Sequence, residues 1–104
     1  MAEFVLLYEG GSMPESEAEQ AKAMKAWEDW FATIGSDLKD GGKPFASAKT
    51  VASDGSVSDG HTGSHLSGYT IVTADSLAAA ADIAKGSPVL VGGGSVRVYE
   101  TIDM

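Results

Sequence analysis

The sequence contains no cysteine, few basic residues and no long apolar run, and each absence excludes a class of protein. Without cysteine there is no disulfide, no thiolate nucleophile and no cysteine-ligated metal. This composition is typical of a reducing compartment, so we expect the protein in the cytoplasm. The beginning of the chain, with the acidic Glu3 and a short apolar run, does not resemble a signal peptide. No segment approaches the roughly 20 apolar residues of a membrane-spanning helix.

Positive charge is scarce, because seven lysine and arginine residues stand against 15 aspartate and glutamate residues. The net charge of −8 repels phosphate backbones and anionic lipid surfaces. We therefore expect neither a nucleic acid nor a membrane as a partner. The acidic surface is explained by solubility, with recruitment of a cationic partner as the alternative.

The length of 104 residues predicts one domain, residues 1–104. A domain of this size buries only about 65% of the surface that its unfolded chain exposes, so a second subunit would enlarge its core.

The first half of the chain predicts a strand, a long helix and a second strand. The apolar run at residues 4–8 is a strand whose two faces are both apolar. A capping box at residues 12–15 and an apolar stripe at spacings of three and four predict a helix from about Met13 to Lys39. The segment Phe45–Ser53 is a weaker strand candidate. Asp54-Gly55 predicts a turn into a short returning arm. The stripe consists of Met24, Trp27, Phe31, Ile34 and Leu38.

The second half repeats the alternation of strand and helix. Residues 69–73 predict a strand, Leu77–Lys85 a helix capped by Asp75 or Ser76, and residues 96–101 a final strand. The order β-α-β-β-α-β predicts an α+β protein with the ferredoxin-like arrangement. In that fold a four-stranded antiparallel sheet carries both helices on one face.

Two helices leave the second face of such a sheet open, yet the strand residues on that face also read as apolar. An apolar face of this kind is costly in water. We therefore expect a homodimer whose open sheet faces pack together around a cavity for a small molecule. The alternative is that the C-terminal residues or a long loop cover the face within one chain.

Several segments of the sequence resemble the YCII-related proteins, most closely the DGPF-domain branch of that family. They are FVLLYEG, the helix with Trp27-x-x-Trp30, VSDG, LSGYTIVTADSLAAAADIAKGSP and the closing GGSVRVYET. The resemblance covers nearly the whole chain and implies the dimeric α+β barrel fold. It also implies a histidine–aspartate pair as a catalytic candidate, since such a pair has been suggested in the wider family. Asp59 and Gly60 match the Asp-Gly-Pro-Phe motif, whereas His61 and Thr62 stand where proline and phenylalanine would be.

The segment SDGHTGSHLSGY holds both histidines of the chain, and three interpretations of it stay open. In the first, Asp59 and either His61 or His65 form an acid–base pair. In the second, the pattern Asp-x-His-x-x-x-His binds zinc or nickel, with Glu100 or a partner subunit completing the shell. The third is an ordinary polar loop, and this is our default interpretation because the spacing is weak evidence for a site. No metal and no cofactor is assigned.

Tyr8 and Tyr69 are candidate hydrogen-bond donors to a ligand, and Trp30 is a candidate wall of an apolar pocket. Two functions from different classes follow. One is a small-molecule enzyme that uses an aspartate–histidine pair for proton transfer. The other is a noncatalytic module that binds a ligand or a protein.

Overall fold

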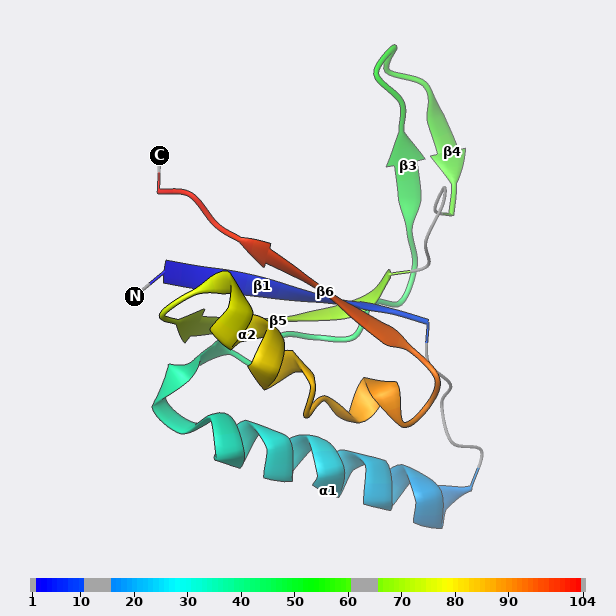
Figure 1. Cartoon of the computed structure of the whole chain (residues 1–104). Coiled ribbons are helices and arrows are strands. Elements are labelled where there is room, and N and C mark those ends of the chain that lie inside the picture. Colours follow the sequence, from blue (N-terminus) through cyan, green and yellow to red (C-terminus); the bar gives the residue numbers. More distant parts are fainter. Residues whose placement is uncertain (1, 11–15, 61–65, 104) are drawn as a thin grey trace.

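The computed structural model describes residues 2–10, 16–60 and 66–103. It shows an α+β protein with two helices, a four-stranded antiparallel sheet and a separate two-stranded sheet (Figure 1). The large sheet has the order β2-β5-β1-β6, so the first strand of the chain lies in its interior. Its strands are β1 (Ala2–Glu9), β2 (Leu38–Asp40), β5 (Leu66–Ala74) and β6 (Ser95–Glu100).

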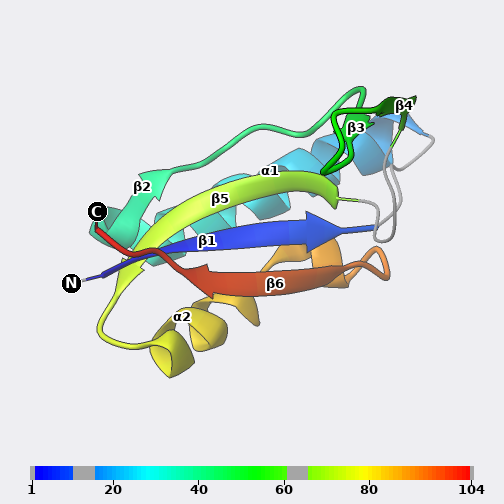
Figure 2. The ribbon, with the colours of Figure 1, turned by 90° about the horizontal axis from the view of Figure 1, so that it is seen from above.

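Both helices lie on the same face of this sheet (Figures 1 and 2). Helix α1 spans Glu17–Ile34 and helix α2 spans Leu77–Ala84. Each begins at a serine whose side-chain oxygen accepts a backbone N–H three residues later, Ser16 for α1 and Ser76 for α2. Ser76 is thus the cap of the second helix, one of the two candidates that the sequence offered.

The expected helix from Met13 to Lys39 is too long at its C-terminal end. Helix α1 ends at Ile34 because Gly35 adopts the positive φ of 65° and its N–H bonds the carbonyl oxygen of Phe31. A single 3₁₀ turn, η1 (Gly35–Asp37), then leads into β2, where Leu38 pairs with Val72. The prediction is also too long at its N-terminal end, because α1 begins at Glu17 and Ser16, its cap, is extended rather than helical. The capping box at residues 12–15 lies outside the described residues.

The expected strand at Phe45–Ser53 is also wrong in its place, because β2 takes the edge position in the sheet. Residues 49–51 instead form β3 (Lys49–Val51), which pairs with β4 (Val57–Asp59) in the two-stranded sheet. The turn predicted at Asp54-Gly55 is confirmed, with Gly55 at a φ of 90°. We refer to residues 46–60 as the arm.

The core lies between the helices and the sheet. Phe4 and Leu6 of β1 and Val72 of β5 are fully buried there. Ala80 and Ala84 of α2 pack against them, since their short side chains allow the helix to approach the sheet closely. Met24, expected on the buried stripe of α1, is 66% exposed, and Trp30 is the buried residue of that helix instead.

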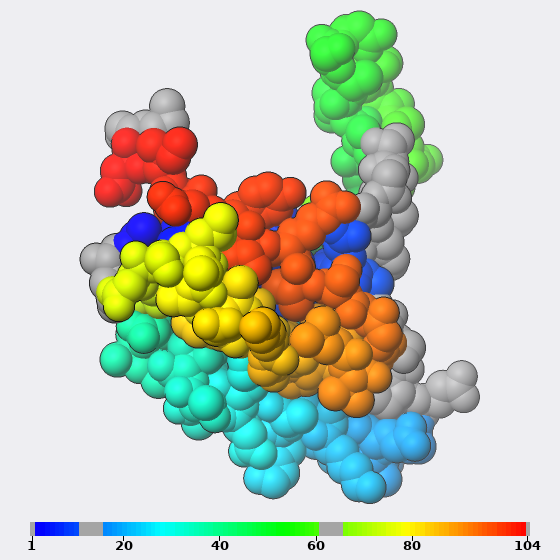
Figure 3. All heavy atoms as spheres, viewed as in Figure 1, coloured from blue at the N-terminus to red at the C-terminus, as the bar shows by residue number. Residues whose placement is uncertain are grey.

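The molecule is extended for its size, with a radius of gyration of 15.0 Å, whereas a compact chain of this length has about 13 Å. The arm causes much of this, because it rises from the side of the sheet opposite the helices (Figures 1 and 3). Within the described residues, no helix is long and apolar enough to cross a membrane.

Candidate functional site

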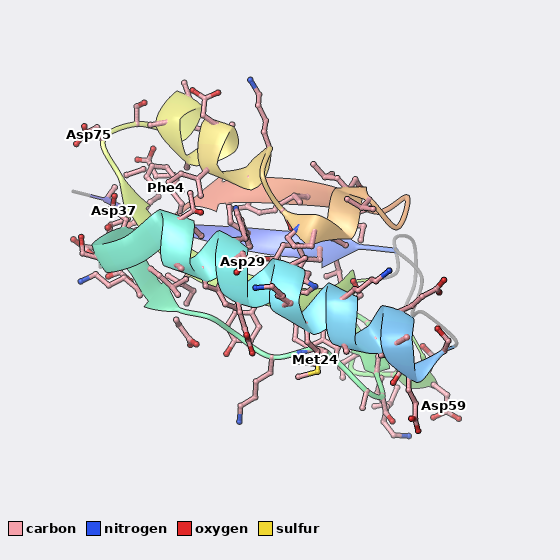
Figure 4. All side chains as sticks on the ribbon, turned by 90° about the horizontal axis from the view of Figure 1, so that it is seen from below. Phe4, Met24, Asp29, Asp37, Asp59 and Asp75 are labelled. Atoms are coloured by element: carbon pink, nitrogen blue, oxygen red, sulfur yellow. The ribbon has the colours of Figure 1, made fainter. Side chains whose placement is uncertain are left out.

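Asp59, the residue best supported by the resemblance, lies at the end of β4 in the arm. Its side chain is 91% exposed and one carboxylate oxygen lies 2.7 Å from the Nζ of Lys49. Figure 4 shows it at the opposite end of the molecule from Asp37 and Asp75. His61 and His65 lie outside the described residues, so the aspartate–histidine pair stays a prediction. The described part of the chain contains no cluster of three potential metal-binding side chains.

Tyr8 lies on the helix-covered face of the sheet, where it is buried. Its hydroxyl donates to the Oγ1 of Thr70 over 2.5 Å, and Thr70 in turn donates to the carbonyl oxygen of Gly41. Burial raises the pKa of Tyr8 to about 12, against the weaker effect of its hydrogen bonds to Thr70 and Ser87. The phenol therefore keeps its proton at neutral pH and holds β1 to β5 from inside the core.

Trp30 belongs to the same layer, between α1 and the segment that follows α2. Its indole N–H donates to the carbonyl oxygen of Ile83 over 3.2 Å, and its ring contacts those of Trp27 and Phe31. It lines a cavity of about 190 Å³ between the two helices, together with Asp82 and Ile83. This cavity opens on the helix side, away from the open face of the sheet.

Tyr69 lies on the opposite face of the sheet from Tyr8. The register places Tyr69 beside Leu7, whereas Tyr8 pairs with Gly68. Because neighbouring residues of a strand point to opposite faces, the two tyrosines cannot reach one ligand within a single chain. Three predicted ligand-binding residues are thus separated into two groups, Tyr8 and Trp30 in the core and Tyr69 on the other face.

We refer to the face that neither helix covers as the open face. Its apolar side chains come from three neighbouring strands, in register with one another: Val5, Leu7, Tyr69, Ile71 and Tyr99. All are partly or largely exposed, and Tyr99 is 50% exposed. Phe45, which precedes the arm, stacks on Tyr69 with ring centroids 6.0 Å apart.

Polar groups lie at two margins of the open face. At one margin, the Nε of Arg97 forms an ion pair with a carboxylate oxygen of Glu9. At the other, the hydroxyl of Tyr69 lies 3.4 Å from a carboxylate oxygen of Asp40. An apolar floor with a few polar groups at its margins is the usual composition of a small-molecule site. The open face is therefore the candidate functional site.

Sequence reasoning located this face and its apolar character but missed Arg97, Glu9, Asp40 and Phe45. The alternation in Val96-Arg97-Val98-Tyr99 did carry a signal, since it places Arg97 and Tyr99 on one face of the last strand. Which face that is depends on the pairing of Arg97 with Leu7. No local pattern reveals that pairing.

No family model, curated protein or solved structure matches the chain.

Proposed function

We propose that the protein is a homodimer that binds a small molecule between two open sheet faces. The observation that carries this proposal is the apolar open face. It offers Val5, Leu7 and Ile71 with two tyrosine rings at the surface of one chain. A second copy would cover both faces at once through a two-fold axis.

The amount of exposed surface supports the same conclusion. One chain exposes 7150 Å². A compact monomer of 10.7 kDa would expose about 5,500 Å². The excess of about 1,600 Å² is larger than the roughly 800 Å² that each partner buries in a standard interface. The chain thus has enough surplus surface for a stable dimer.

The order β2-β5-β1-β6 with antiparallel neighbours supports the ferredoxin-like arrangement as part of this proposal. With a second copy on the open face, the assembly would be a dimeric α+β barrel. The resemblance to the YCII-related proteins points the same way.

The polar groups of the open face indicate binding rather than acid–base catalysis. Arg97 is paired with Glu9, and two phenol hydroxyls stand beside an apolar floor. These groups would orient a small apolar molecule that carries a hydrogen-bonding group. The enzyme alternative rests on Asp59 and the two histidines, and the histidines lie outside the described residues.

Sedimentation velocity over protein concentrations from about 1 μM to about 1 mM tests the dimer. The native chain should sediment at twice the mass of one chain, and Ile71→Lys should dissociate it because a charge is then buried between the faces. Leu77→Lys is the matched control, since Leu77 is half-exposed on α2. A native chain that stays monomeric over this range contradicts the proposal.

Nile red, a neutral dye with polarity-sensitive emission, tests the ligand site. The native dimer should bind it saturably, with a fixed number of dye molecules per dimer. Tyr69→Ala should keep the dimer and change the affinity by at least about threefold. Leu90→Ala, on the helix side, should leave it unchanged. A native dimer without saturable binding removes the ligand half of the proposal.

A further inference from the structure

Among the described residues, the arm stands outside both the large sheet and the core. Its strands β3 and β4 pair with each other, and neither joins the large sheet. Every residue from 46 to 59 is exposed except Thr50. An isolated two-stranded hairpin is marginally stable in water and needs a third strand or an apolar surface to pack against.

The arm carries a pair of exposed apolar side chains. Val51 and Val57 lie directly opposite each other in the register and are 65% and 62% exposed. Side chains that are paired across two strands point to the same face of the hairpin. The two valines therefore form one small apolar surface on the arm.

The position and the length of the arm both suit an exchange between two copies. It stands on the side of the sheet where the open face lies, away from α1 and α2 (Figures 1 and 3). Each leg of the hairpin has about seven residues and reaches at most about 23 Å, and four strands span roughly 15 to 20 Å. The arm is thus long enough to cross the sheet of a neighbouring copy.

We propose that the arm of one copy packs through Val51 and Val57 against the open face of the second copy, and that the exchange is reciprocal. This inference rests on the proposed homodimer and specifies how its interface is built. A reciprocal exchange covers two unsupported arms and two open faces with one two-fold axis. The exposed surface of one chain exceeds that of a compact monomer by more than a standard interface buries on each partner. Contact of the arms in addition to the faces accounts for this larger excess.

The absence of cysteine makes a direct test possible. A nitroxide is attached to Val51→Cys in an unlabelled chain, and this chain is mixed with native chain labelled with nitrogen-15. Intermolecular relaxation should broaden the amide signals of β1, β5 and β6 in the native chain. The control label at Met24→Cys, on the exposed side of α1, should leave those signals sharp.

A second variant measures the contribution of the arm to association. The double variant Val51→Ser and Val57→Ser should fold normally, as circular dichroism would show, because both side chains are exposed in one chain. Its dimer should dissociate at least about tenfold more readily than the native dimer.

The outcomes separate this inference from the proposed function. A native dimer with no intermolecular broadening, and with unchanged affinity in the double variant, overturns the arm exchange and keeps the homodimer. Broadening that appears only when the nitroxide and the nitrogen-15 are in the same chain shows that the arm covers its own face, which also overturns the exchange. A monomeric native chain overturns both proposals.

Discussion

The body of the molecule and the arm both contain antiparallel strands with valines, but their surroundings differ. In the body, β1 lies between two strands and packs against two helices, so Leu6 and Phe4 are fully buried. In the arm, β3 and β4 pair with each other and with no other strand of the described residues, and Val51 and Val57 stay exposed. The comparison teaches that pairing in a strand does not by itself bury a valine, and that the neighbouring elements decide what the side chain contributes to stability.

The largest difference in unfolding free energy between body and arm should come from substituting two glycines with positive φ. Gly42→Ala in the body should destabilise the chain by more than about 3 kcal/mol. A Cβ there would lie 1.6 Å from the carbonyl oxygen of Tyr69. Gly55→Ala in the arm has open space around the new methyl group, so only the backbone strain of about 1 kcal/mol applies. Urea unfolding measures both, and equal losses would contradict the contrast between body and arm.

A smaller difference in unfolding free energy between body and arm is expected when one valine in each is replaced by alanine. Val72→Ala should cost about 2 to 3 kcal/mol of unfolding free energy, because Val72 is fully buried between sheet and helices. Val57→Ala should stay within about 0.5 kcal/mol when unfolding is measured at concentrations too low for association. If Val57→Ala lowers the unfolding free energy by much more than this at low protein concentration, the arm packs against its own chain.

The buried tyrosine of the body predicts a dependence on alkaline pH. Because burial raises the pKa of Tyr8 from 10.0 to about 12, the folded state holds the proton more tightly than the unfolded state. The resulting stability is complete below pH 10 and is lost as the pH rises toward 12, by up to about 2 kcal/mol. Tyr8→Phe should remove this slope from unfolding curves, whereas Tyr99→Phe, at a half-exposed position, should retain it.

The smallest effect on stability is expected in the arm at Asp59. Asp59→Asn breaks an exposed ion pair with Lys49, and such pairs contribute between about 0 and 1 kcal/mol. The same variant tests the catalytic alternative through an NMR titration of His61 and His65. A histidine pKa at least about one unit above 6.5 that falls in the variant would establish the pair. If both histidines titrate near 6.5 in the native chain and in the variant, the interpretation as an ordinary polar loop remains.

The elements that the sequence predicted well are those whose signals are local. The strands at residues 4–8 and 69–73, the serine-capped second helix and the turn at Asp54-Gly55 all agree with the structure. Leu38 was misplaced because its spacing continues the stripe of α1. The decisive interaction, the pairing of Leu38 with Val72, joins residues far apart in the chain.

The candidate site likewise contains residues that the sequence identified and residues that only the structure revealed. The sequence indicated an apolar second face and named Tyr69, which does lie on the open face. It also named Tyr8 and Trp30, which the structure places in the core. For Tyr8, one position along the strand decides which face of the sheet the side chain joins. Arg97 and Glu9 form their ion pair across two strands, and their separation in the sequence hides it.

The sequence by itself determined the apolar runs, the cap of the second helix and the turn at Asp54-Gly55, because these depend on residues within one or two turns of chain. It also determined the exclusion of thiol chemistry, since the chain has no cysteine. Only the tertiary structure decided which edge strand completes the sheet, which tyrosine is buried and which segment stands out as an arm. Those features depend on strand register and on contacts between distant residues, which local sequence patterns do not specify.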